Sequence, residues 1–197
     1  MIDTLVEKAK GFILDPVETF RQSRNDEPGA VLMYFVPLLV VNAFLSAVVA
    51  AAVVGMISRF AGLNLGAPFP VVVFFAVLVA GFILTFIFAA WVHLVAYLFG
   101  GRKGIMETVK AIIYGHTPRL LFGWIPVIGF IFVLWSLVLN ILGIRELQEL
   151  STMKATLVIA IAVLIPLILV ILALVAFFTI ASATTLPSPG PVTSLLR

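Results

Sequence analysis

The part of the sequence with the most varied chemistry is an otherwise apolar segment from Ile105 to Phe122. It holds an acid, a base and a phenol, namely Glu107, Lys110 and Tyr114. Side chains three and four residues apart lie on the same face of a helix. Glu107 can therefore pair with Lys110, and Tyr114 would face the same side. Such a group can bind an ion, a lipid headgroup or a polar part of a partner.

Metal, redox and hydrolytic sites are excluded by residue type. The chain has no cysteine and only two histidines, His93 and His116, whereas a metal site needs three or four ligands. The aspartates, Asp3, Asp15 and Asp26, all lie in the polar first 29 residues. The sequence has neither a nucleophile elbow nor a phosphate-binding loop. We therefore expect no catalytic residue, no metal, no cofactor and no enzyme activity.

The composition is typical of an integral membrane protein. Hydrophobic residues make up 63% of the 197 residues and charged residues 11%, against about 45–50% and about 25% in soluble domains. No Asp, Glu, Lys or Arg occurs in residues 28–58, 60–101, 120–144 or 155–196. About 20 apolar residues span a bilayer as a helix, so the chain can cross several times. The twelve basic residues form no stripe, which argues against nucleic acid as a partner and leaves the lipid bilayer.

Glycine, proline and charged residues divide the apolar sequence into five predicted transmembrane helices. They lie at about residues 30–57, 70–99, 105–122, 126–147 and 155–180. Basic residues favour the cytoplasmic side, which places the N-terminus in the cytoplasm and, with five spans, the C-terminus outside. A four-span count satisfies this rule equally well. The break from Gly123 to Pro126 favours five.

Charges within the spans need an explanation, because an ionised side chain near the bilayer centre costs at least about 2.5–3.5 kcal/mol. Glu107, Lys110 and Arg119 can extend to the membrane interfaces, or they can belong to a polar pocket between helices. The candidate intramembrane polar pocket consists of Asn42, His93, Glu107, Lys110, Tyr114 and Asn140. Hydrogen bonding between helices would use the same residue types, so both uses stay open.

The first 29 residues form a polar segment that we expect to be helical. Apolar residues at helical spacing between Ile2 and Ile13 predict an amphipathic helix, which can lie in the membrane interface or pack against the protein itself. Asp15, Pro16 and Glu18 predict a capping box at the start of a second short helix.

These observations predict three regions. They are a cytoplasmic amphipathic segment at 1–29, a transmembrane domain of five helices at 30–181, and a flexible tail at 182–197. The tail contains three prolines together with several Ser and Thr, which is typical of a loose terminus.

An ordered set of short motifs resembles the Yip1 domain family. The motifs are Ile13-Leu14-x-Pro16 with Phe20, Tyr114-Gly115-x-Thr117-Pro118, Trp124-Ile125-Pro126-x-Ile128-Gly129, Trp135-Ser136-x-x-Leu139, Gly143-Ile144-x-Glu146-Leu147 and Ser151-x-x-Lys154-Ala155. The resemblance covers about residues 1–180 and implies five transmembrane helices, a cytoplasmic N-terminus and an outward C-terminus. Eukaryotic members act in vesicle transport and bind prenylated Rab GTPases. This chain lacks their long polar N-terminal region and resembles the compact prokaryotic branch, so we do not transfer the Rab role.

The resemblance favours a non-enzymatic membrane adaptor or scaffold in membrane organisation or trafficking-like processes. The expected location is the prokaryotic plasma membrane, and the expected partners are unknown proteins or a second copy of the chain. The candidate cytoplasmic partner surface consists of Arg102, Lys103, Arg145 and Glu146. The alternative is a small transporter or channel whose cavity is the polar pocket described above.

Overall fold

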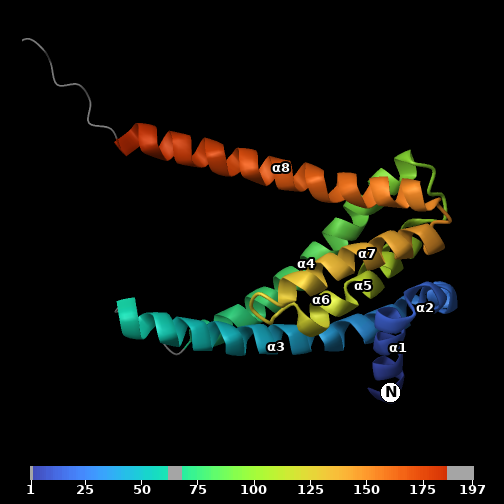
Figure 1. The fold of residues 1–197 in the computed structure, drawn as a ribbon, viewed down its shortest axis with the longest axis horizontal. Coiled ribbons are helices and arrows are strands. Elements are labelled where there is room, and N and C mark those ends of the chain that lie inside the picture. Colours follow the sequence, from blue (N-terminus) through green and yellow to red (C-terminus); the bar gives the residue numbers. More distant parts are fainter. Residues whose placement is uncertain (1, 62–67, 186–197) are drawn as a thin grey trace, which may run out of the picture. The chain divides into compact units, whose positions relative to one another are not determined.

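The described part of the chain is helical, which confirms the predicted all-α class. The computed structural model describes residues 2–61 and 68–185, and no β-strand occurs among them. The helices are α1 (Ile2–Leu14), α2 (Pro16–Gln22), the 3-10 helix η1 (Ser23–Asn25), α3 (Pro28–Ala61), α4 (Phe69–Leu98), α5 (Ile105–Gly115), α6 (Thr117–Phe122), α7 (Gly129–Leu147) and α8 (Thr152–Thr185) (Figure 1). Residues 186–197 of the predicted flexible tail lie outside the described residues.

Contacts divide the chain into two compact units. The first ends at Ala160 and contains α1 to α7 with the first turns of α8, and the second begins at Ile161. The sites considered below all lie in the first unit.

Four helices, α3, α4, α7 and α8, are long and apolar enough to cross a membrane. The predicted span at 105–122 is not among them, because the chain breaks at His116 into α5 and α6. Pro118 lies in the first turn of α6 and has no backbone N–H, so the hydrogen-bond ladder of α5 cannot continue through it. The prediction of five spans is therefore not confirmed.

The start of α2 was predicted correctly, but the predicted cap is wrong. The helix begins at Pro16, yet the side chain of Asp15 makes no capping hydrogen bond. The hydroxyl of Thr19 instead donates to the carbonyl of Asp15 at 2.7 Å. A proline suits the first helical position because its missing N–H is not needed there, so the helix can start without the carboxylate.

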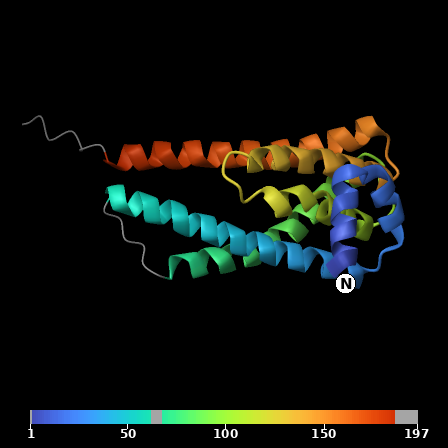
Figure 2. The same ribbon diagram turned by 60° about the horizontal axis from the view of Figure 1, so that its bottom comes forward.

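The two N-terminal helices belong to the packed core of the first unit. α1 lies across the end of α3, and α2 packs against α7 (Figure 2). Phe12 of α1 and Phe20 of α2 are fully buried, with ring centroids 4.9 Å apart. Helices occupy both predicted stretches, while the amphipathic, interfacial character of α1 stays a prediction. We call the end of the bundle that carries α1 and α2 the N-terminal side.

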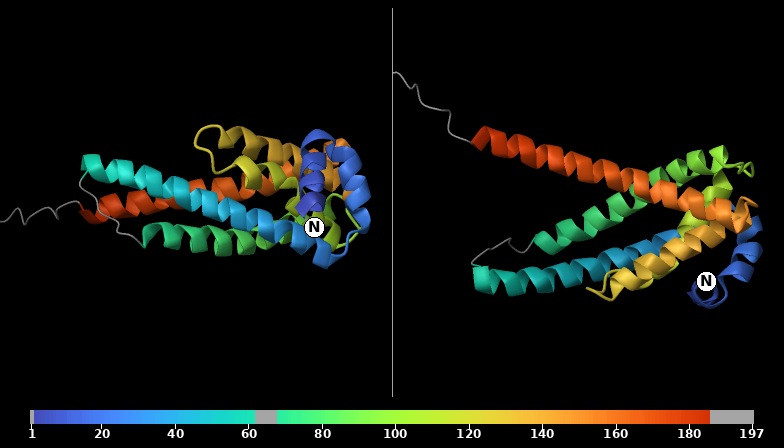
Figure 3. Two further views of the ribbon diagram at one scale, coloured as in Figure 1. Left: turned by 90° about the horizontal axis from the view of Figure 1, so that it is seen from below. Right: turned by 45° about the horizontal axis from the view of Figure 1, so that its top comes forward.

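α5 lies at the centre of the first unit, where it packs against α4 and α7. Every residue from Ala111 to Gly115 is buried. α3 and α4 extend well beyond this region, and α3 has no buried residue from Val48 to Phe60. The turn that joins α6 to α7 lies beside the middle of α3 rather than beside its end (Figure 3). The α5–α6–α7 hairpin is therefore shorter than the helix pair that it packs against.

Candidate functional site

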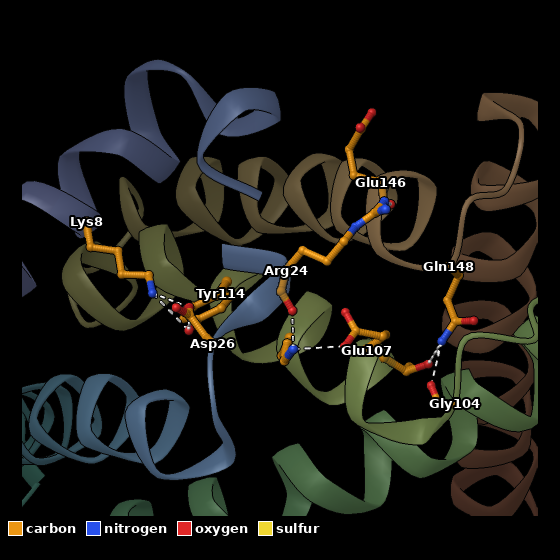
Figure 4. A network of polar contacts seen from close by, with 10 residues as sticks. Lys8, Arg24, Asp26, Gly104, Glu107, Tyr114, Glu146 and Gln148 are labelled. Atoms are coloured by element: carbon orange, nitrogen blue, oxygen red, sulfur yellow. Dashed lines mark hydrogen bonds and ion pairs between the residues drawn. The ribbon is translucent and has the colours of Figure 1, made fainter. Parts of the chain in front are cut away.

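A network of polar side chains joins the N-terminal helices to α5 and to the end of α7 (Figure 4). We call it the polar network. Its members are Lys8, Arg24, Asp26, Glu107, Lys110, Tyr114, Glu146 and Gln148.

The first part of the polar network holds α1 against α5. Lys8 pairs with the carboxylate of Asp26 and donates a hydrogen bond to the hydroxyl of Tyr114 at 3.1 Å. The Tyr114 hydroxyl in turn donates to Asp26. The buried ring of Tyr114 stacks on Phe12 with centroids 4.7 Å apart. This arrangement satisfies both charges while it keeps the aromatic ring out of solvent.

The second part of the polar network is the pair of Glu107 and Lys110 at 2.8 Å, which confirms the predicted pairing. Lys110 is 4% exposed and also donates to the backbone carbonyl of Arg24. Arg24 itself donates to the carbonyl of Glu146 at 2.5 Å. A buried ammonium group needs an acid and further acceptors to offset its lost hydration, and here the chain supplies both.

The third part of the polar network closes the turn before α5. Gln148 donates to the carbonyl of Gly104 at 2.7 Å and to the hydroxyl of Thr108 at 2.9 Å. Gly104 has a φ of 96°, a backbone conformation that glycine adopts without steric cost. Thr108 also bonds the ring of His93 on α4, with Nδ1 and Oγ1 2.9 Å apart. One buried glutamine thus positions the start of α5 between α4 and α7.

The remaining residues of the predicted pocket lie apart from this cluster. Asn42 donates to the carbonyl of Leu120 at 2.9 Å and lines a cavity that none of the other five predicted residues lines. Asn140 lies against Gly115, and its buried Oδ1 has no hydrogen-bond partner among the described residues. The structure therefore brings Glu107, Lys110 and Tyr114 into one network and places Asn42 and Asn140 elsewhere.

Two glycines that sequence reasoning did not select allow α5 and α7 to pack closely. A Cβ atom at Gly115 would lie 2.1 Å from Oδ1 of Asn140 and 3.0 Å from its backbone nitrogen. A Cβ at Gly143 would lie 2.9 Å from the ring of Phe20. Both glycines stand inside the motifs quoted above, which was the available signal for their role. Small residues at helix contacts let the backbones approach in this way.

The four residues of the predicted partner surface lie on the N-terminal side, and most of them bond to other parts of the chain. Lys103 pairs with Glu149 at 2.6 Å. The side chain of Arg102 lies over the ring of Tyr97, 3.6 Å from its centroid. The Lys103 ammonium, as a hydrogen-bond donor, lowers the pKa of the exposed Glu149 carboxyl.

Glu146 is the centre of a cluster of ion pairs on the same side. It pairs with Arg145 at 2.7 Å and with Arg21 at 3.0 Å. The hydrogen bond and charge of Glu146 raise the pKa of Arg21 above its usual value. Arg24 also reaches this side and pairs with Glu149 at 2.8 Å. Arg21, Arg24 and Glu149 were not among the four residues of the predicted partner surface, and only folding brings α2 and η1 beside the end of α7.

The buried contacts of α5, α6 and α7 involve the same motif residues that carry the resemblance noted above: Tyr114, Gly115, Thr117, Pro118, Ser136, Leu139, Gly143, Ile144 and Leu147. Residues 10–185 match the Yip1 domain. The chain belongs to the Yip1 domain family. Comparison with curated proteins and with solved structures gives no match. The Yip1 domain is not a known enzyme family, and this member is a multi-pass membrane protein.

Proposed function

We propose that this Yip1-domain protein is a non-enzymatic membrane adaptor that binds a protein partner on its N-terminal side. The observation that carries the proposal is the placement of charge. Every ion pair between described residues lies on that side, formed by α1, α2, η1, the turn before α5, the first half of α5 and the end of α7. Exposed and partly exposed charged groups such as Arg102, Arg145 and Glu149 give a partner a mixed surface of both signs, which favours specific recognition over general attraction.

The contacts within the bundle support an adaptor more than a transporter. Glu107, Lys110 and Tyr114 are bonded to other groups of the chain rather than left facing an open cavity. His93 bonds Thr108. Polar residues used in this way hold helices together, and a conduction path would need them free to bind a solute.

The proposal includes a topology with the N-terminal side in the cytoplasm and the far ends of α3 and α8 outside, in the plasma membrane of a prokaryote. α5 and α6 in series would then form the third crossing. The chain has no cysteine, so single cysteines can be labelled without background. With Arg102→Cys and Arg59→Cys, a membrane-impermeant maleimide should label position 59 in intact cells and position 102 only after permeabilisation. The reverse pattern would overturn the orientation.

The adaptor role is tested by photocrosslinking in the native membrane, with a photoreactive residue in place of the exposed Lys10 on α1. We expect one abundant protein partner to be captured by the full chain and lost in Arg102→Ala/Lys103→Ala, whose side chains are exposed. Arg59→Ala is the matched control, because it removes an exposed arginine from the opposite end of α3. Capture that is equal in all three chains, or self-crosslinks alone, would contradict the role.

A further inference from the structure

The guanidinium group of Arg119 on α6 has no ion-pair or hydrogen-bond partner among the described residues. Within residues 2–61 and 68–185, no acid pairs with this group and no acceptor binds it. The backbone of Arg119 is nevertheless held firmly. Its N–H donates to the hydroxyl of Ser136 at 3.0 Å, and its carbonyl accepts from Asn42 at 3.4 Å. Because arginine stays ionised in proteins, the described part of the chain leaves this charge free to bind an anion.

Arg119 lines a cavity of about 230 Å³ between α3, α4, α6 and α7. Its polar lining includes Asn42 and Ser46 of α3 and the indole of Trp124, while Val77 and Val133 make part of the wall apolar. The indole N–H is already donated to the carbonyl of Leu121 at 2.7 Å. The cavity therefore offers one cation and short polar side chains beside an apolar wall, which suits an anionic group attached to an apolar body.

The position along the helices places this cation away from the charged N-terminal side. Arg119 follows Glu107 by 12 residues, which is at most about 18 Å along α5 and α6. Asn42 at the same cavity precedes Arg59 by 17 residues, or about 25 Å along α3. α4 contains no charged residue. A charge in such surroundings is unfavourable unless water or a counter-charge reaches it.

The short hairpin explains how a headgroup can reach this depth. α5 and α6 have 11 and 6 residues, at most about 26 Å end to end, whereas the 34 residues of α3 extend about 51 Å. The exposed residues at the turn between α6 and α7 include Val127, Ile128 and Phe130. A bilayer adapts to a short apolar segment by thinning locally. Lipid headgroups beside the short hairpin would thus lie level with the middle of α3, whereas headgroups elsewhere would lie level with the end of α3.

We propose that Arg119 binds the phosphate group of a membrane phospholipid, with the acyl chains against the apolar walls of the same cavity. Guanidinium groups bind phosphate through paired, charge-assisted hydrogen bonds. Free inorganic phosphate shares this chemistry, but it would have to cross the apolar surface around the cavity. The proposal is independent of the adaptor role, which concerns the N-terminal side.

The test measures thermal unfolding of the full chain in a neutral detergent, titrated with phosphatidylglycerol. A ligand that binds the folded state raises Tm with concentration. We expect this rise for the wild type and for Arg119→Lys. Arg119→Gln should need about tenfold more lipid or above, since it loses a charge-assisted contact. Arg59→Gln is the matched control and should respond like the wild type.

A second variant separates loss of lipid binding from a folding defect that the change at position 119 could cause. Ser46→Leu fills the cavity and keeps the arginine, so it should also lose the response. Diacylglycerol has the acyl chains without the phosphate, and inorganic phosphate has the charge without the acyl chains. Neither should raise Tm as the phospholipid does. An unchanged response in Arg119→Gln and Ser46→Leu would overturn the site. An equal rise with inorganic phosphate, or with diacylglycerol, would overturn the choice of a phospholipid.

Discussion

The part of the bundle around α5, which we call the inner part, packs differently from the far end of α3, which we call the outer part. Residues 111–115 of α5 are all buried, whereas residues 48–60 of α3 include no buried side chain. The inner part combines glycines, aromatic rings and paired charges, and the outer part carries mostly exposed or partly exposed apolar side chains, such as Val53 and Met56. In the inner part residues are buried against other residues of the chain, while in the outer part many apolar side chains are exposed. The structure of the domain is therefore determined mainly by its inner part.

The largest effect that we predict is that of Gly115→Ala, at the closest approach of α5 and α7. The added Cβ would lie 2.1 Å from Oδ1 of Asn140 and 3.0 Å from its backbone nitrogen, and the backbone cannot move away without separating the helices. Overpacking of this kind costs about 1–3 kcal/mol or more. The measurement is the Tm of the purified protein in detergent, followed by tryptophan fluorescence.

The matched control for this prediction is Gly55→Ala on the outer part of α3. A Cβ atom at Gly55 meets no other atom within 4 Å, and alanine is the better helix former by up to about 1 kcal/mol. We expect its Tm to equal or exceed that of the wild type. Equal losses of Tm for the two variants would show that the inner and outer parts do not differ as described.

The second prediction concerns Asp26→Asn in the polar network. The change removes the acid from Lys8 and the acceptor carboxylate from Tyr114, so that a partly buried ammonium group loses its counter-charge. We expect a loss of about 1–3 kcal/mol of stability. Asp3→Asn, at an exposed position on α1, should leave the denaturant midpoint unchanged. A midpoint for Asp26→Asn within error of the wild type would mean that α1 is held by its aromatic contacts alone.

The smallest effect should come from the exposed pair of Glu149 and Lys103. Their hydrogen bond lowers the folded-state pKa of Glu149 below 4.5, so the pair contributes stability above that pH and loses it as the pH falls through the lowered pKa. As the pH is lowered from 6 to 3, the unfolding temperature should fall less steeply in Glu149→Gln than in the wild type. Added salt should reduce the difference, since exposed charges are screened. Parallel curves would show that the pair contributes nothing.

Several elements could be predicted because they depend on local sequence. The charge-free runs at 28–58, 60–101 and 155–196 correspond to α3, α4 and α8, since length and apolarity suffice to identify a helix that crosses a membrane. Pro16 located the start of α2, and spacing alone identified the pair of Glu107 and Lys110. The run at 105–122 was harder to interpret. Its mainly apolar composition favours a single span and so hides the break at His116. That break depends on one residue, Pro118, which lacks the N–H of a helical hydrogen bond.

Composition and spacing are enough to predict a helical membrane protein, the position of most of its helices, and the charges that stand in apolar surroundings. The partners of those charges depend on how the helices pack. Lys8 meets Tyr114 across 106 residues of sequence, and Lys110 meets the carbonyl of Arg24 across 86. Helical periodicity says which residues share a face, but not which face of which other helix they meet. That choice follows from the close approach at Gly115 and Gly143, which aligns α5, α7 and α2.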